Sequence, residues 1–276
     1  MAAQDPIGLF DSGVGGLSIM KEVRRLLPQE DLIYVADSKF CPYGEKTPAA
    51  IQDRARKITT FLLTQGAKLI VVACNTASVA ALNELRAEFA VPFIGVEPAV
   101  KQAALFTKNK KIGVLATGLT LSGERFTSLV ENYGGGLTVV NQACPGLVEA
   151  VEAGEISGPG TERLLQKYLQ PLQEKGVDVV VLGCTHYPFL RPLVEKLVAP
   201  GVRVLDTGTP VAKQTKRVLT ENKLLTPGPR AGKEWFYTSG DPAVVSPVIE
   251  RLWGGRGAGV AALPAPYLTL RSLEEE

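Results

Sequence analysis

The sequence contains one histidine, His186, and four cysteines, no two of which have C-x-x-C spacing. A structural zinc site needs about four such ligands, commonly in closely spaced pairs, so we expect no metal ion. Four cysteines in a chain of 276 residues are also too few to indicate a disulfide framework. The sequence therefore predicts free thiols and no metal centre.

Strong net charge and long apolar runs are also missing. The 30 basic and 28 acidic residues are well mixed and leave a net charge of +2, which gives no support for nucleic-acid binding. No apolar run reaches the roughly 18 residues of a membrane span, and the N-terminus lacks the layout of a signal peptide. We therefore expect a soluble, cytoplasmic protein without a nucleic-acid or membrane partner.

Strand-like apolar runs alternate with amphipathic, helix-like segments along the chain, and an apolar fraction of 45% is ample for a core. This alternation is typical of βαβ units and parallel sheets. At about 150 residues per domain the length favours two domains, so the predicted fold class is α/β with two doubly wound parallel-sheet domains. The predicted strands lie near Ile7–Phe10, Leu32–Ala36, Leu69–Ala73, Phe93–Val96, Lys111–Ala116, Leu137–Val140, Val177–Leu182, Val202–Leu205 and Trp235–Thr238.

An internal repeat supports this prediction. The apolar runs Leu69–Ala73 and Val179–Gly183 lead into Cys74-Asn75-Thr76 and Cys184-Thr185-His186, and the two cysteines lie 110 residues apart. The strand-like segments that begin at Ile7 and Ile112 repeat in a similar way at an offset of 105 residues. We infer two related halves, each with one cysteine at the carboxyl end of a strand.

The first domain is predicted to comprise residues 1–98 together with 207–253, and the second residues 99–206. In this interpretation the helix-like Thr209–Asn222 and the strand-like Trp235–Thr238 return to complete the first domain. The Gly-rich stretch that starts at Gly254 and the acidic end of the chain are expected to form a mobile tail, residues 254–276.

The glycine-rich segment Asp11–Gly16 follows the first predicted strand and opens a helix. One hypothesis is a nucleotide- or anion-binding loop, with Asp37 near the place of a ribose-binding acid. Against it, the third glycine of G-x-G-x-x-G is replaced by Ser18, and Asp11 would repel phosphate. Another hypothesis is a tight turn that needs positive φ. The residues fit best a site for a carboxylate, with Asp11 free for a cationic amine or acid–base chemistry.

Cys74 and Cys184 each end a predicted strand and precede a helix-like segment, where ligands gather in such folds. Asn75 and Thr76 resemble a helix cap. A thiol at a helix N-terminus has a lowered pKa and is a better base or nucleophile. A lone cysteine is usually part of the core, and a redox disulfide is a rival interpretation, but the position of this pair favours acid–base chemistry.

His186 stands two residues after Cys184, where an imidazole can assist proton transfer. Asp11 is expected to serve Cys74 in the same way, because adjacent parallel strands bring their ends together. Cys41 and Cys144 have no acid–base partner in the local sequence, so we expect both to be structural.

These residues resemble those of the glutamate racemases, cofactor-independent enzymes that supply D-glutamate for bacterial peptidoglycan. The resemblance covers about residues 6 to 224 and is carried by the motifs Phe10–Leu17 (FDSGVGGL), Pro42–Gly44 (PYG), Ala73–Thr76 (ACNT) and Gly183–Pro188 (GCTHYP). It implies two α/β domains in pseudo-twofold symmetry with a small site between them, no cofactor, glutamate as substrate, and a homodimer.

The resemblance also implies roles for individual residues. Cys74 would take the α-proton from D-glutamate and Cys184 from L-glutamate, with Asp11 and His186 as their assistants. Glu152 sits where the family places another acid near the second thiol. Thr120 matches a binding threonine, although the order of Ala116–Thr120, which includes Thr117, departs from the family pattern. The residues that would hold the substrate are Ser12, Pro42, Tyr43, Gly44, Asn75, Thr76, Thr120 and Thr185.

Inversion at an α-carbon removes a proton on one face and returns one on the other, which suits two thiols from facing domains. Without an electron sink such as pyridoxal phosphate, for which no lysine motif stands out, hydroxyls and amides must stabilise the carbanion. Three alternatives stay open: a racemase for another acidic amino acid such as aspartate, a nucleotide- or anion-binding α/β protein, and a periplasmic-type binding protein, which the missing signal peptide disfavours.

Overall fold

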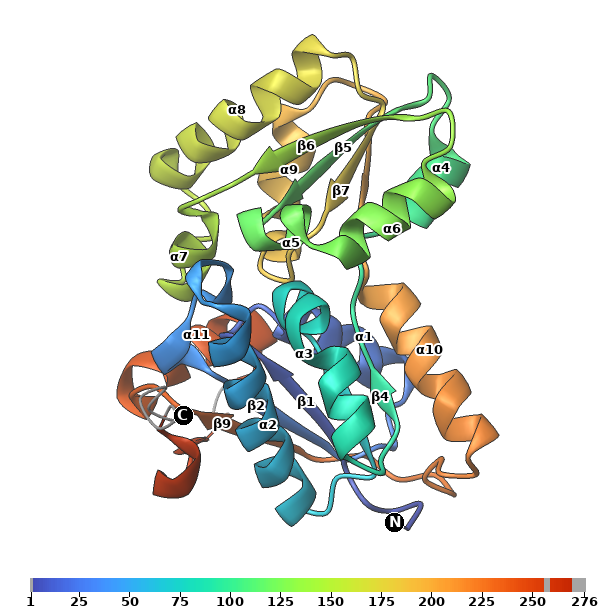
Figure 1. Ribbon diagram of the computed structural model, residues 1–276. Helices are drawn as coiled ribbons and strands as arrows, with labels where there is room; N and C mark the ends of the chain where they lie inside the picture. Colours follow the sequence, from blue (N-terminus) through green and yellow to red (C-terminus); the bar gives the residue numbers. More distant parts are fainter. Residues whose placement is uncertain (1, 256–258, 270–276) are drawn as a thin grey trace.

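The computed structural model describes residues 2–255 and 259–269 and contains two sheets in which every strand pair is parallel (Figure 1). The predicted α/β fold class with two doubly wound parallel sheets is therefore confirmed. The first sheet has the order β10-β9-β2-β1-β3-β4 and the second β6-β5-β7-β8. Their strands are β1 (Ile7–Asp11), β2 (Leu32–Ala36), β3 (Leu69–Val72), β4 (Phe93–Ile94), β9 (Glu234–Thr238) and β10 (Val260–Ala262), then β5 (Lys111–Ala116), β6 (Thr138–Ala143), β7 (Val179–Leu182) and β8 (Arg203–Leu205).

Helices cover both faces of the sheets, as the alternating sequence pattern predicts (Figure 1). Those of the first half are α1 (Leu17–Leu26), α2 (Pro48–Thr64), α3 (Asn75–Glu88), α10 (Gly208–Glu221) and α11 (Pro242–Trp253). Those of the second are α4 (Val100–Phe106), α5 (Gly118–Ser122), α6 (Glu124–Tyr133), α7 (Leu147–Glu152), α8 (Pro159–Glu174) and α9 (Arg191–Leu197). Short 3₁₀ turns are η1 (Ser38–Phe40), η2 (Tyr43–Glu45), η3 (Tyr187–Leu190) and η4 (Ala265–Tyr267). No helix among the described residues combines the length and hydropathy that crossing a membrane requires.

The two halves share one winding order and one register. The order β2-β1-β3-β4 of the first sheet corresponds to β6-β5-β7-β8 of the second. Ile7 pairs with Leu69 in the first sheet, and Ile112 pairs with Val179 in the second, at the repeat offsets of 105 and 110 residues. The internal repeat of the sequence is therefore a repeat of strand pairing, and it gives Cys74 and Cys184 equivalent places.

The central strands are fully buried, which is why they are continuous apolar runs. All residues of β1, β3 and β7 are buried, and the side chains of β3 are 0% exposed. Each buried valine, leucine or isoleucine stabilises the fold by about 1.5–3 kcal/mol relative to exposure. The loops that follow these strands consequently start from rigid positions.

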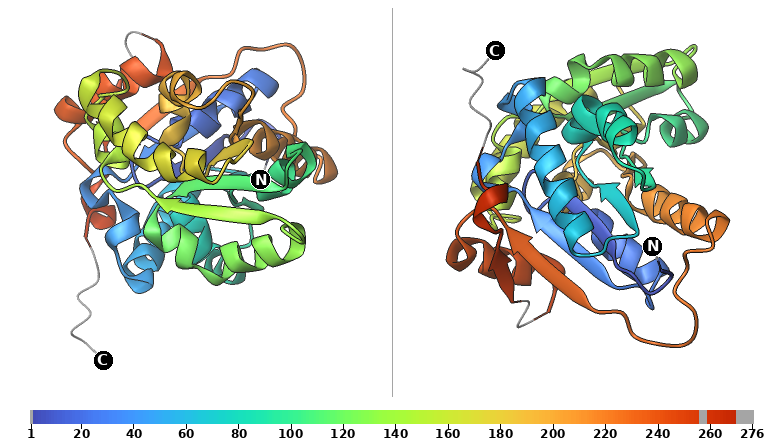
Figure 2. Two further views of the ribbon diagram at one scale, coloured as in Figure 1. Left: turned by 90° about the horizontal axis from the view of Figure 1, so that it is seen from above. Right: turned by 60° about the horizontal axis from the view of Figure 1, so that its bottom comes forward.

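The chain crosses between the halves twice, around residues 95–99 and 206–207, and its C-terminal part returns to the first sheet (Figure 2). There β9 pairs with β2, with Leu32 opposite Glu234, and α10 packs against α1. This return agrees with the expected path of the chain. The domain bounds at residues 98 and 207 stay a prediction.

The expectation of a tail from residue 254 is wrong for residues 259–269. β10 adds a parallel strand to the edge of the first sheet beside β9, and Leu263 is buried in the core of that half. A three-residue strand has too little sequence for any periodicity, and the edge of β9 that it covers exists only in the folded sheet. Residues 256–258 and 270–276 of the expected tail lie outside the described residues.

Candidate active site

Cys74 and Cys184 line one small pocket where the carboxyl ends of the two sheets meet. Each follows a central strand of its sheet by two residues, since β3 ends at Val72 and β7 at Leu182. Their side chains are 4% and 7% exposed, and all four cysteines of the described chain are free thiols. The structure thus brings together the two thiols that the repeat singled out.

The pocket gathers every residue predicted to hold a substrate. Its cavity is about 10 Å³, room for about one water molecule, so the pocket is closed in this conformation. Asp11 and Glu152 stand behind its wall and touch residues that line it. The lining residues are Ser12, Pro42, Tyr43, Gly44, Cys74, Asn75, Thr76, Thr117, Thr120, Val148, Cys184, Thr185 and His186.

Cys184, His186 and Glu152 form a hydrogen-bonded row. The sulfur of Cys184 lies 3.6 Å from Nδ1 of His186, and Nε2 of His186 lies 2.6 Å from Oε1 of Glu152. Burial alone lowers the pKa of His186, but hydrogen bonds to Cys184, Cys41 and Glu152 outweigh it and hold that pKa well above its ordinary value. The row can therefore keep an imidazolium beside the Cys184 sulfur.

Asp11 reaches Cys74 only through Ser12. The Cys74 thiol lies 3.9 Å from the hydroxyl of Ser12, which in turn lies 3.4 Å from Oδ1 of Asp11. The other carboxylate oxygen accepts a hydrogen bond of 2.8 Å from Thr185, beside the second cysteine. Complete burial raises the pKa of Asp11 to about 6, against the lowering influence of His186 and of the Gly13 amide. Asp11 is thus a buried acid–base group that touches both cysteine loops.

Cys74 itself is the N-cap of α3, and this corrects two expectations. Asn75 and Thr76 are the first helical residues and not the cap, and the Cys74 sulfur accepts a hydrogen bond of 3.4 Å from the Ala77 amide. Burial raises the pKa of Cys74 well above its ordinary value, and the negative charge of Asp11 adds to this. The lowered pKa expected at a helix N-terminus is therefore wrong for the pocket without substrate, because loss of hydration outweighs one amide contact.

The glycine-rich loop holds a carboxylate, but that carboxylate is Glu152. The Val14 amide donates a hydrogen bond of 2.7 Å to its Oε1. A Cβ on Gly13 would lie 2.0 Å from the same oxygen, and a Cβ on Gly15 would lie 2.3 Å from Nδ1 of His186. These glycines leave room for Glu152 and His186 of the other half. The hypothesis of a turn with positive φ is wrong for Gly13 and Gly15, because neither residue adopts it.

The features that suggested a nucleotide site serve other contacts. Asp37 is completely buried and pairs with Arg54 at 2.8 Å, so it is not a ribose-binding acid. The hydroxyl of Ser18, at the place of the third glycine, donates to the carbonyl oxygen of Thr185. With the loop amide of Val14 bound to Glu152, the nucleotide-binding hypothesis loses its structural basis.

Polar groups without partners point to a ligand in the pocket. Asn75 is 3% exposed, and both polar atoms of its amide are buried without a hydrogen bond within the described chain. Such atoms cost free energy unless a ligand or water satisfies them. Nearby, the hydroxyls of Thr76, Thr117 and Thr120 lie 2.9–3.2 Å from one another and join the two halves. Amide and hydroxyls together can bind a carboxylate.

Tyr43 contributes less than expected through its hydroxyl. That hydroxyl donates a hydrogen bond of 2.5 Å to Asp37, and the side chain is 1% exposed. The Asp37–Arg54 pair thereby fixes the turn η2 against the first half. Tyr43 and Gly44 both line the pocket, but the Tyr43 hydroxyl is already bound to Asp37.

The structure changes the interpretation of Cys41 and leaves Cys144 as expected. Cys41 is half-buried. Its sulfur, a carboxylate oxygen of Glu152 and a ring nitrogen of His186 all lie within 4.8 Å of one another. Cys144 is buried, and its thiol donates to the carbonyl oxygen of Gln142 at 3.3 Å. Sequence reasoning missed Cys41, Thr117 as a partner of Thr76, and Val148, because their neighbours in the pocket come from distant segments.

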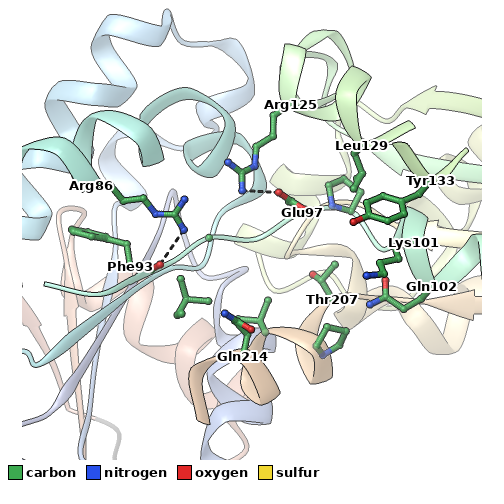
Figure 3. Close-up of a pocket in the computed structure, with 15 residues that line it drawn as sticks. Arg86, Phe93, Glu97, Lys101, Gln102, Arg125, Leu129, Tyr133, Thr207 and Gln214 are labelled. Atoms are coloured by element: carbon green, nitrogen blue, oxygen red, sulfur yellow. Dashed lines mark hydrogen bonds and ion pairs between the residues drawn. The ribbon is translucent and has the colours of Figure 1, made fainter. Parts of the chain in front are cut away.

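A much larger cavity, of about 370 Å³, lies where the chain crosses between the halves (Figure 3). Arg86, Glu97, Arg125, Thr207 and Gln214 are among its lining residues, and Glu97 pairs with Arg125 at 2.6 Å. None of the described residues that line it is a cysteine or histidine. Size therefore does not identify the catalytic site, and we assign the chemistry to the small pocket between the thiols.

Comparisons with known proteins agree with this geometry. The family model described as Asp/Glu/Hydantoin racemase matches residues 7–215. A glutamate racemase from Pseudomonas putida is 49% identical over 249 residues, 90% of this chain and 94% of that protein. The solved glutamate racemase RacE1 from Bacillus anthracis superimposes with a TM-score of 0.87 at 31% identity over 96% of this chain and 99% of its own. The solved glutamate racemase from Thermus thermophilus, in complex with beta-chloro-D-alanine, superimposes with a TM-score of 0.84. It is 38% identical, and the match covers 97% of this chain and 100% of its own.

Proposed function

The chain belongs to the glutamate racemases within the Asp/Glu/hydantoin racemase family, and we propose that it interconverts L- and D-glutamate with Cys74 and Cys184 as its two acid/base groups. One observation carries the mechanism. The two thiols occupy equivalent places in two matching sheets and line a single closed pocket. Proton removal on one face of the α-carbon and proton return on the other require such a pair.

In the direction from L- to D-glutamate, Cys184 is the base. His186 as imidazolium, held by Glu152, stabilises the thiolate form of Cys184 by charge. Cys74 starts as the neutral thiol, in keeping with its raised pKa. The thiolate takes the α-proton, and Cys74 donates its own proton to the opposite face of the carbanion.

In the reverse direction the roles exchange. Cys74 removes the α-proton of D-glutamate, and Cys184 donates to the other face. The Ser12 hydroxyl lies 3.9 Å from the Cys74 sulfur and 3.4 Å from Oδ1 of Asp11, so Asp11 assists through this hydroxyl. After each inversion the two cysteines have exchanged protonation states, and exchange with water resets them.

The carbanion needs strong electrostatic stabilisation. A turnover of ~10 per second corresponds to a barrier of roughly 16 kcal/mol, and an α-amino acid is a weak carbon acid. The unpartnered amide of Asn75 and the hydroxyls of Thr76, Thr117, Thr120 and Thr185 are positioned around the pocket to bind the substrate's carboxylates. Such preorganised donors act best in a site without water, which the closed pocket provides.

Substrate entry requires the pocket to open. A cavity of about 10 Å³ does not hold glutamate. The three threonine hydroxyls join the halves at one side, and a neighbouring cavity of about 220 Å³ shares Pro42, Gly44, Thr117 and Val148 with the pocket. We propose that separation at these residues connects the two spaces and admits the substrate.

The direct test is proton NMR of L-glutamate in D₂O with the purified protein, a thiol reductant and no added cofactor. We expect loss of the Cα–H signal together with formation of D-glutamate. Persistence of the signal for both enantiomers would overturn the proposal. Aspartate is measured in parallel, because the aspartate alternative predicts faster exchange with that substrate, whereas we expect glutamate to be preferred.

Variants of the cysteines test the assignment of the two thiols. Cys74→Ala and Cys184→Ala each remove one acid/base group, so we expect each to lower racemisation by at least a factor of about 10²–10⁴. Cys144→Ala is the matched control for a buried thiol. Cys144 lines the neighbouring cavity but not the small pocket, so this variant should keep far more activity than the other two. Equal activity of all three variants would refute the two-thiol mechanism.

The homodimer and the cytoplasmic location implied by the family resemblance are proposals as well, as is the supply of D-glutamate for peptidoglycan in the cell. Light scattering of the purified protein tests the first. A mass of one chain, 29.5 kDa, at working concentration would exclude the dimer.

A further inference from the structure

We propose that Cys41, Glu152 and His186 form a binding site for one thiophilic divalent cation, for which Zn²⁺ is the best fit, and that the bound ion inhibits the enzyme. One ligand atom from each residue lies within 4.8 Å of the other two. The inhibition rests on the proposed function, whereas binding of the ion does not. Glu152 and His186 also serve Cys184 in the proposed reaction, which uses no metal, so the ion would compete with catalysis.

The three residues come to the site from both halves of the molecule. Cys41 follows η1 in the first half, whereas Glu152 ends α7 and His186 follows β7 in the second. A bound ion would therefore link the halves directly beside the pocket, which Pro42 and His186 help to line. Since the pocket has to open for glutamate to enter, this link would hold it closed.

The donor set matches Zn²⁺ better than the common hard cations. It offers one thiolate sulfur, one imidazole nitrogen and one carboxylate oxygen, whereas Mg²⁺ and Ca²⁺ prefer oxygen ligands alone. Zinc bonds of about 2.0–2.3 Å in tetrahedral geometry place ligand atoms roughly 3.3–3.8 Å apart. Since the ligand atoms lie within 4.8 Å of one another, shifts of about 1 Å or less by the side chains of Cys41 and Glu152 complete the geometry.

Cys41 is available for this role. It is half-buried, so an ion in solution can reach it, and it neither gives a proton to the substrate nor takes one from it in the proposed mechanism. Burial raises its pKa to about 12, which makes it a neutral thiol without the ion. Coordination replaces the thiol proton, and the thiolate and the Glu152 carboxylate balance the charge of the ion.

The ion would disable one side of the reaction. It competes for the Glu152 carboxylate, which binds Nε2 of His186 at 2.6 Å without the ion. A metal on this imidazole would also hold the ring that lies 3.6 Å from the Cys184 sulfur, so Cys184 loses this partner. Because every inversion uses both thiols, racemisation stops in both directions.

Co²⁺ binding to the metal-free protein tests the site without any measurement of activity. We expect one equivalent of Co²⁺ to give a thiolate-to-cobalt charge-transfer band in the near ultraviolet, which Zn²⁺ abolishes by displacement. Cys41→Ser should lose the band, and Cys144→Ser should keep it. A band that persists in the Cys41 variant would place the ion on Cys74 and Cys184 and overturn the proposal, as would absence of any band.

Inhibition is then measured with Zn²⁺, with Mg²⁺ as the control ion and EDTA to reverse the effect. We expect Zn²⁺ to inhibit the unaltered protein reversibly and Mg²⁺ to have no effect. Measured against its own activity without metal, Cys41→Ser should need at least tenfold more Zn²⁺ for half inhibition, whereas Cys144→Ser should respond like the unaltered protein. Equal sensitivity of the two variants would refute inhibition through this site. If the protein shows no racemase activity at all, the cobalt measurement still decides whether the ion binds.

Discussion

The carboxylate of Glu152 fills the space that a side chain at residue 13 would need. A Cβ on Gly13 would lie 2.0 Å from Glu152 Oε1, the oxygen that accepts a hydrogen bond from Val14 and lies 2.6 Å from His186. The loop after β1 is therefore shaped to seat an acid from a helix 138 residues further along the chain. Its glycines therefore support the proposed acid–base role of Cys184, although they carry no functional group.

The first prediction concerns this close approach. Gly13→Ala should displace Glu152 from His186 and lower kcat/KM on the order of a hundredfold, the loss typical of a catalytic group moved by ~1 Å. The control is Gly135→Ala, because no atom lies within 4 Å of a Cβ at that residue. Both variants are assayed for racemisation and checked by circular dichroism. If Gly13→Ala is folded and fully active, the fit of Glu152 against this loop is not required.

The second prediction separates the two sides of the reaction. Loss of the imidazole in His186→Gln should slow proton removal by Cys184 and leave removal by Cys74 less affected. Because the equilibrium constant of a racemisation is one, kcat/KM must fall equally in both directions and is not informative. The primary isotope effect on kcat/KM does distinguish the two sides. It should rise for α-deuterated L-glutamate, whose deuteron Cys184 removes, and fall for α-deuterated D-glutamate, for which reprotonation by Cys184 becomes rate-limiting. The opposite pattern would assign His186 to Cys74.

The third prediction is the pH dependence of stability due to Asp11. The folded protein holds this proton to a pKa of about 6, whereas the unfolded chain releases it near the ordinary value of 3.8. The folded state therefore binds more protons between these values, and its stability falls as pH rises from about 4 to 6. The cost at pH 7 is up to about 3 kcal/mol. Urea unfolding of Asp11→Asn and of the unaltered protein measures this effect. The free energy of unfolding of the variant, relative to that of the unaltered protein, should increase as pH rises from about 4 to 6 and stay constant below pH 4.

The pH dependence of activity should also reflect Asp11, but in the opposite direction: activity should rise where stability falls. If the ionised Asp11 assists Cys74, kcat/KM of the unaltered protein falls as pH drops below about 6, where the carboxylate is protonated. Asp11→Asn should be slow and lack this acidic limb. A limb that remains unchanged in the variant would show that another group causes it.

The fourth prediction concerns the buried pair that fixes η2. Asp37→Asn leaves the Arg54 guanidinium, whose side chain is 2% exposed, without its carboxylate and frees the Tyr43 hydroxyl. We expect a loss of about 3–5 kcal/mol in the free energy of unfolding and a raised KM. The double variant Asp37→Asn with Arg54→Met should recover part of the stability, because no unpaired charge stays buried, but not the KM. Additive losses in the double variant would contradict the coupling.

Local sequence determined the elements and the repeat. Continuous β-branched apolar runs such as Leu69–Val72 and Val179–Leu182 are typical of central strands of parallel sheets, and each run ends beside its cysteine. Their matching register follows from the same short-range pattern, so the α/β fold and the pair of thiols were predictable. Residues next to the thiols, such as His186 and Asn75, were predictable for the same reason.

What depends on long-range packing was not predictable from these patterns. Glu152 meets Val14, and Thr185 meets Asp11, across 138 and 174 residues of chain. The pKa of Cys74 is raised because the closed pocket removes water from it, which outweighs the helix N-terminus visible in the sequence. Long-range packing also brings Cys41 close to His186, requires a glycine at residue 13 to leave space for Glu152, and places β10 beside β9. Sequence patterns record the preferences of neighbouring residues, whereas burial, charge pairing and close approach exist only after the two halves have closed on each other.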